Sequence, residues 1–159
     1  MDNEATLRTT VTAYFEVLNA ENWDGMRSLW HRDGELSAVG ARPRAGAAAV
    51  MTYFQKIFDP WPEHRDEPTR LLVCERDRAV VAELRFMGRT RDGRSVTFDA
   101  VDVFDIEGGQ IRRMTSWYDI AAARRATAIR SDAGVDPVAA VLDGPDAAPG
   151  SQQATSGSE

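Results

Sequence analysis

Asp102 lies in the middle of an apolar segment, Ser95–Glu107, and its position needs a chemical explanation. Burying an ionised carboxyl costs free energy unless the group is paired or stays protonated. If the segment is a strand, side chains two residues apart share a face, and Asp102 lies beside Phe98, Ala100 and Phe104. We expect this face to form a pocket wall in which Asp102 serves as an acid.

Asp102 also has a plainer interpretation, because it could face solvent or form an ion pair across the sheet with Arg85 or Arg112. Tyr14 is the second candidate residue, since it lies on the apolar side of a predicted helix. A tyrosine there is either a core aromatic with a satisfied hydroxyl or a hydrogen-bond donor to a bound molecule. The residue types alone leave both questions open.

Hydrophobic spacing predicts the elements that position these residues. Apolar side chains at spacings of three and four indicate amphipathic helices, and the first of these carries Tyr14. Helices are predicted over Ala5–Ala20, Asn22–Trp30 and Ala47–Phe58, with a turn at Arg32–Gly34 and a short strand over Glu35–Val39. From Thr69 onward, runs rich in Val, Leu, Phe and Thr predict strands. These cover Arg70–Arg76, Ala79–Thr90, Ser95–Glu107 and Gln110–Ile120.

Helices followed by an antiparallel meander predict an α+β domain over residues 1–130, with the helices on one face of the sheet. The other face is free to form a homodimer interface. The segment Ser131–Glu159 is rich in Ala, Asp, Gly, Pro and Ser and has few large apolar groups. We therefore expect it to be a disordered tail.

Charge and motifs exclude several function classes. The net charge of −6 would repel a phosphate backbone, so nucleic acid is not an expected partner. No apolar run approaches the roughly 20 residues of a membrane span, and the acidic N-terminus is unlike a secretory signal, so a cytoplasmic location is expected. No phosphate-binding motif or metal-ligand spacing occurs, so no metal or organic cofactor is expected. His31 and His64 are interpreted as surface or interface residues, and Cys74 as a small buried hydrophobe.

Three stretches of the chain, read together, resemble a known family: TAYFEVLNAENWDGMRSLW, VGARPRAGAAAVMTYF and DAVDVFDIEGGQIRRMTSWYDI. They are similar to the steroid Δ5-isomerases and the wider SnoaL-like cyclases of the NTF2-like superfamily, over most of residues 5–120. The resemblance implies a cone-shaped fold in which a curved antiparallel sheet wraps around three N-terminal helices. Because this fold hosts isomerases, cyclases, dehydratases, epoxide hydrolases and binding proteins, the reaction is implied less specifically than the fold.

The resemblance also implies roles for the two candidate residues. Tyr14 matches the isomerase tyrosine that donates a hydrogen bond to the substrate oxygen, and Asp102 matches its partner acid, which an apolar site keeps protonated. Together they would form an oxyanion hole for a developing enolate or alkoxide. The expected pocket-lining residues are Trp30, Phe54, Met114 and Tyr118 from the family, with Ala100 and Phe104 from the strand pattern.

One position departs from the isomerase pattern. The isomerase base is an aspartate in the strand before the loop that contains Pro43, and here it falls on Ser37 or Ala38. Neither side chain can abstract a proton from carbon. Either another residue is the base, or Asp102 works through a water while Tyr14 and a serine position the substrate. The candidates for a base or for substrate positioning are Glu35, Ser37, Ser116 and Asp119, with Asp33 at the turn.

The function predicted from these residues is cofactor-independent isomerisation, cyclisation or dehydration by acid–base catalysis. The expected substrate is a hydrophobic polyketide-, terpenoid- or steroid-like molecule of natural-product metabolism. One alternative is an epoxide hydrolase or epoxide-opening cyclase of the same fold, for which Asp102 could supply the acid. The other is a non-catalytic, dimeric ligand-binding module, which the loss of the family base favours.

Overall fold

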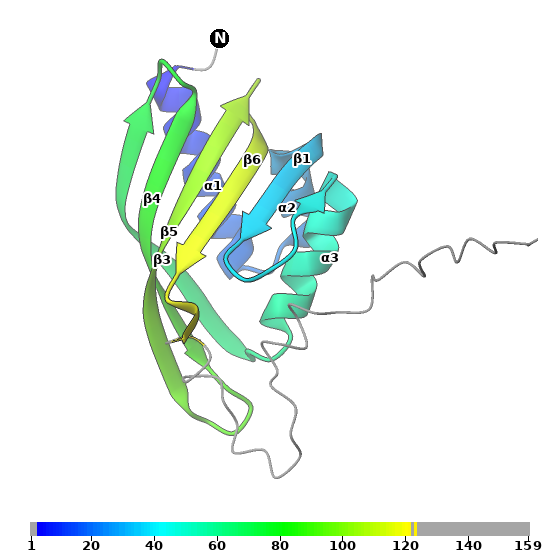
Figure 1. The fold of residues 1–159 in the computed structure, drawn as a ribbon, viewed down its shortest axis with the longest axis vertical. Coiled ribbons are helices and arrows are strands. Elements are labelled where there is room, and N and C mark those ends of the chain that lie inside the picture. Colours follow the sequence, from blue (N-terminus) through cyan, green and yellow to red (C-terminus); the bar gives the residue numbers. More distant parts are fainter. Residues whose placement is uncertain (1–2, 122, 124–159) are drawn as a thin grey trace, which may run out of the picture.

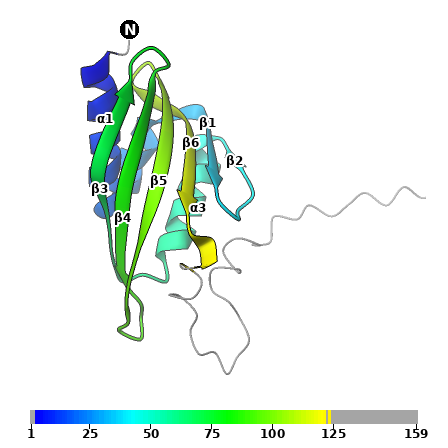
Figure 2. The same cartoon turned by 60° about the vertical axis from the view of Figure 1, so that its left-hand side comes forward.

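A computed structural model of the chain describes residues 3–121 and 123. The helices are α1 (Glu4–Asn19), α2 (Trp23–Leu29) and α3 (Ala47–Phe58). The strands are β1 (Trp30–Ala38), β2 (Arg44–Ala45), β3 (Glu63–Cys74), β4 (Ala79–Arg89), β5 (Ser95–Glu107) and β6 (Gln110–Tyr118). The helices lie together on one side of a curved sheet (Figures 1 and 2). The predicted α+β fold is confirmed.

Helix α1 forms because both its capping and its spacing favour it. The Asn3 side chain accepts a hydrogen bond from the Thr6 N–H at 2.9 Å, which satisfies one of the free donors at the helix start. The predicted apolar stripe is buried against the sheet, where α1 packs on β3 and β4. Its buried residues are Leu7, Thr10, Val11, Tyr14, Phe15 and Leu18.

The six strands form one sheet in the order β2-β1-β6-β5-β4-β3. Strands β3 to β6 form the predicted antiparallel meander. Strand β1 pairs with β6 in parallel, so the sheet is mixed rather than wholly antiparallel. The meander brings β6 back beside β1, and Figure 1 shows these two strands next to each other.

Three expectations about local structure are wrong. The turn predicted at Arg32–Gly34 is part of β1, with an irregular register between Trp30 and Glu35. Strand β3 begins at Glu63 rather than Arg70, because an edge strand tolerates both charged residues and a proline. Cys74, at the end of that edge strand, is exposed rather than buried.

Two predictions about the rest of the molecule remain predictions. The expected tail, Ser131–Glu159, lies outside the described residues, as does the boundary near residue 130. The outer face of the sheet carries Trp117, which is 59% exposed, and the homodimer interface expected there is untested. Within residues 3–121 and 123, no helix has the length and apolar character needed to cross a membrane.

Candidate active site

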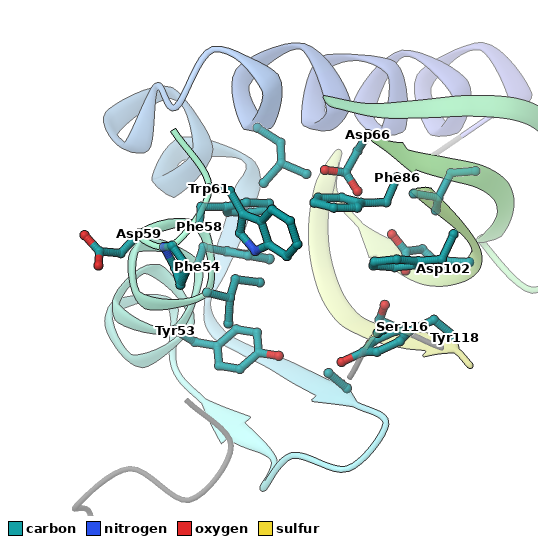
Figure 3. A pocket seen from close by; sticks show the side chains of 18 of the residues that line it. Tyr53, Phe54, Phe58, Asp59, Trp61, Asp66, Phe86, Asp102, Ser116 and Tyr118 are labelled. Atoms are coloured by element: carbon teal, nitrogen blue, oxygen red, sulfur yellow. The ribbon is translucent and has the colours of Figure 1, made fainter. Parts of the chain in front are cut away.

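A cavity of about 450 Å³ lies between the concave face of the sheet and helices α1 and α3. Its walls are mainly apolar and aromatic, from Phe54 and Phe58 on α3 to Phe86 and Phe98 on the sheet, with Trp61 between them. Figure 3 shows the polar groups of Asp66, Asp102 and Ser116 among these rings. A few polar groups in an apolar cavity are typical of a small-molecule site.

Asp102 faces this cavity from the middle of β5 and is only 5% exposed. Burial raises the pKa of its carboxyl to about 7, and a hydrogen bond with the Ser116 side chain, opposite it on β6, acts in the other direction. Its Oδ1 atom has no hydrogen-bond partner among the described residues. The ion pair considered for it does not occur, since Arg85 pairs with Asp99 on the outer face. Among the described residues, Asp102 is therefore a buried acid that forms no ion pair with an arginine or lysine.

Asp66 is a second buried acid in the same cavity, 9% exposed, on β3. Its backbone is fixed to the end of α1, because Asn19 accepts from its N–H at 2.7 Å and donates to its carbonyl oxygen at 2.9 Å. Burial, and then the charge of Asp102, raise the pKa of Asp66 to about 7. Its Oδ2 atom has no hydrogen-bond partner within the described part of the chain. The cavity thus holds two carboxyls that influence each other's ionisation.

The sequence analysis did not identify Asp66, because the segment around it is strongly charged and was not predicted to be a strand. Alternation within β3 contains the signal that could have found it. Glu63, Arg65 and Glu67 point outward, whereas Asp66 points inward. An acid on the less charged face of an edge strand was the available indication.

The hydroxyl groups of two tyrosines add to the polar lining. Tyr14 is 1% exposed and packs edge-on against Phe104, with ring centroids 5.0 Å apart. Burial raises the pKa of its phenol well above the usual value, and the charges of Asp102 and Asp66 raise it further. Burial raises the pKa of Tyr53 likewise. Both phenols therefore stay protonated and are able to donate hydrogen bonds.

The structure brings together only some of the residues selected from the sequence. Those that line the cavity are Tyr14, Asp102, Ser116, Phe54, Ala100, Met114 and Tyr118. Trp30 and Phe104 are buried in the core but do not line it. Asp119 is exposed and lies outside the lining.

The candidate bases on β1 also lie away from the cavity. Leu36 and Ala38 face it, so alternation turns Glu35 and Ser37 to the other face of the strand. Of the two residues that match the isomerase base in the resemblance, Ser37 and Ala38, only Ala38 lines the cavity, and its side chain is a methyl group. Among residues 3–121 and 123, no three His, Cys, Asp or Glu side chains are grouped as a metal site would need.

These features define a small α+β domain with an apolar cavity and two buried acids. A SnoaL-like domain model matches residues 11–114, so the chain belongs to the SnoaL-like family, as its sequence predicted. A search of curated proteins finds no match.

Solved structures share the fold at low sequence identity. SalBIII, an epoxide hydrolase/cyclase-like enzyme in pyran ring formation in the polyether salinomycin, is 24% identical, with a TM-score of 0.69 over 77% of this chain and 97% of that one. A candidate polyketide cyclase from Xanthomonas campestris pv. campestris is 22% identical, with a TM-score of 0.67 over 76% and 95% of the two chains. An LEH-like epoxide hydrolase from M. tuberculosis is 17% identical, with a TM-score of 0.66 over 77% and 89%.

Proposed function

We propose that this protein opens an epoxide in a hydrophobic substrate, using Asp66 and Asp102 as a general acid–base pair. The observation that carries the proposal is that two buried carboxyls line one apolar cavity, and among the described residues neither forms an ion pair with an arginine or lysine. The sequence analysis offered Asp102 as the acid for epoxide opening but no second group to act as the base. Asp66 supplies the missing second group.

The two acids differ in their surroundings, and this difference assigns their roles. The Ser116 hydrogen bond favours the ionised form of Asp102, so Asp102 is the base. The charge of Asp102 favours the protonated form of Asp66, so Asp66 is the acid. Two coupled carboxyls with pKa values near 7 hold about one proton between them at neutral pH.

The reaction needs no oxidant or reductant. Asp66 gives its proton to the epoxide oxygen as the carbon–oxygen bond breaks. A hydroxyl oxygen attacks the carbon and loses its proton to Asp102. If this hydroxyl belongs to the substrate, the product is a cyclic ether with a new hydroxyl, whereas attack by water gives a diol. Each turnover leaves Asp66 ionised and Asp102 protonated.

Isomerisation or dehydration is the second candidate, and the position of Tyr14 supports it. Tyr14 lines the cavity, and the charges of both acids raise the pKa of its phenol. Its hydroxyl could therefore donate a hydrogen bond to a substrate carbonyl oxygen. Asp66 would then replace the absent base of β1. Substrates with a carbonyl group and no epoxide distinguish this reaction from the first.

The test is turnover of apolar epoxy alcohols of graded chain length by the purified full chain in ¹⁸O-labelled water, followed by mass spectrometry. We expect a cyclic ether without heavy oxygen or a diol with one heavy oxygen, formed faster than without protein. Asp66→Asn and Asp102→Asn should each lower the rate by at least about 100-fold.

Asp99→Asn is the matched control, since Asp99 lies on the same strand as Asp102 but on the outer face, paired with Arg85. It should retain the wild-type rate. Full activity of either cavity variant would contradict the assigned acid–base pair. Turnover of unsaturated ketones with no reaction of any epoxide would replace the first candidate with the second.

A further inference from the structure

His64 lies directly behind the Asp66 carboxyl, although the sequence suggested a surface position. Its side chain is 3% exposed, and its ring stacks on Phe58 with centroids 4.1 Å apart. Its Nε2 atom lies 3.2 Å from Oε1 of Glu21, whose side chain is about half exposed. Its Nδ1 atom lies 4.0 Å from Oδ2 of Asp66. The imidazole therefore stands between the cavity acid and a carboxylate that contacts solvent.

The gap between His64 and Asp66 is chemically unusual. Nδ1 of His64 and Oδ2 of Asp66 are both buried, and neither has a hydrogen-bond partner among the described residues. Leaving two such atoms unpaired costs stability, and they lie 4.0 Å apart, slightly beyond hydrogen-bond distance. Because Oδ2 faces the imidazole, the other carboxyl oxygen is left for the cavity.

We propose that His64 relays protons between solvent and Asp66, by way of Glu21. The inference rests on the proposed function for its purpose, since Asp66 must regain a proton after each turnover. The proton would pass from Nδ1 of protonated His64 to Oδ2 of Asp66, which leaves a neutral imidazole with its remaining hydrogen on Nε2. The ring would then turn so that the bare Nδ1 takes up the next proton from the Glu21 side, and turn back with both nitrogens protonated. Asp102 would release its acquired proton to the cavity, so the cycle closes without net change.

The groups around His64 fit this role. Burial lowers the pKa of His64, and the hydrogen bond with Glu21 opposes that effect. A neutral imidazole that donates from Nε2 to Glu21 presents the lone pair of Nδ1 to a protonated Asp66. Helix α3 contributes the apolar ring of Phe58, and the β4 residue opposite His64 is a glycine. Asp66 is in turn faced by Asp102 from β5 and Tyr14 from α1.

Nuclear magnetic resonance of the full chain with labelled histidines tests the contact without any substrate. The chain has two histidines, so His31→Gln assigns both signals. In the wild type, the pH curve of the His64 signal should show an inflection from the imidazole itself and another from the Asp66 carboxyl. Asp66→Asn should remove one of them.

Asp33→Asn is the matched control, because the Asp33 carboxyl lies 3.9 Å from Nδ1 of His31. It should leave the His64 curve unchanged. An identical His64 curve with and without the Asp66 carboxyl would overturn the proposal, whether or not the protein opens an epoxide.

Kinetics test the relay itself, once a substrate is known. His64→Phe keeps a ring to stack on Phe58, and Glu21→Gln changes only an exposed group, so the second variant supports the test if the first does not fold. Both should leave the first turnover and kcat/KM unchanged and lower steady-state kcat by about tenfold or more, with KM falling in proportion. Equal loss in the first turnover would show a structural role only and would refute the relay.

Discussion

Replacing Asp102 by asparagine should stabilise the fold, and should do so mainly at neutral and higher pH. Folding raises the pKa of this carboxyl from 3.8 to about 7, so ionisation of the native state is disfavoured. Three units at about 1.4 kcal/mol each amount to roughly 4 kcal/mol. The pKa of Asp102 is higher in the folded state than in the unfolded state. Below pH 3.8 the carboxyl is protonated in both states and costs no stability, whereas the free energy of unfolding falls as the pH rises through about 7.

Urea unfolding followed by tryptophan fluorescence measures this difference. Between about pH 4.5 and about pH 8, the stability gained by Asp102→Asn should increase by roughly 3 kcal/mol, since most of the interval between the two pKa values lies in this range. Loss of the Asp102 charge should also lower the pKa of Asp66, which adds to the gain at the higher pH. Asparagine has nearly the same shape, so the packing of the cavity wall is retained.

Asp99→Asn is again the control, because its ion pair with Arg85 is exposed and should give the same small change at both pH values. The reasoning fails if Asp102→Asn changes the free energy of unfolding equally at the two pH values. That result would mean that the native carboxyl ionises as readily as an exposed one.

Three further substitutions test the cavity. Tyr14→Phe keeps the aromatic packing but removes the hydroxyl, and should lower kcat by about tenfold with unchanged unfolding by urea; an unchanged kcat would exclude a role for the hydroxyl. Asn19→Ala removes both hydrogen bonds to the Asp66 backbone and should lower the free energy of unfolding by roughly 1–3 kcal/mol. Wild-type stability would show that these two hydrogen bonds contribute little. Gly88→Ala places a methyl carbon 2.7 Å from the Trp61 ring, so it should shift the tryptophan emission and weaken the binding of an apolar fluorescent probe; unchanged binding would place Trp61 outside the ligand site.

Period-two alternation placed the residues of β5 correctly. Ala100, Asp102 and Phe104 are buried on the concave face, as predicted, and Asp99 lies on the outer face. The apolar spacing of α1 likewise placed Tyr14 in the core. These predictions succeed because the two faces of each element differ strongly in polarity, so local sequence contains the information.

The errors arise where packing between distant segments decides the structure. Gly34 was interpreted as part of a turn, but a Cβ atom there would lie 2.8 Å from the Trp30 ring and 3.1 Å from the carbonyl oxygen of Ile111 on β6. A glycine required for close approach looks the same in sequence as a glycine required for a turn. Asp66 was missed for a related reason, since its segment was not predicted to be a strand, and the alternation that turns this one acid inward becomes informative only once the segment pairs with β4.

Asp102 retains a proton at neutral pH in part because two arginines of the neighbouring strands lie on the other face of the sheet. Arg85 pairs with Asp99, and Arg113 lies 3.7 Å from the Asp105 carboxyl, both on the outer side of β5. An arginine beside Asp102 would stabilise the carboxylate, lower its pKa and remove the shared proton at neutral pH. The inner face instead offers phenols, a serine hydroxyl and aromatic rings. The placement of Arg85 and Arg113 on the outer face thus allows a buried pair of carboxyls to work as acid and base near neutral pH, at the cost in stability that Asp102→Asn should reveal.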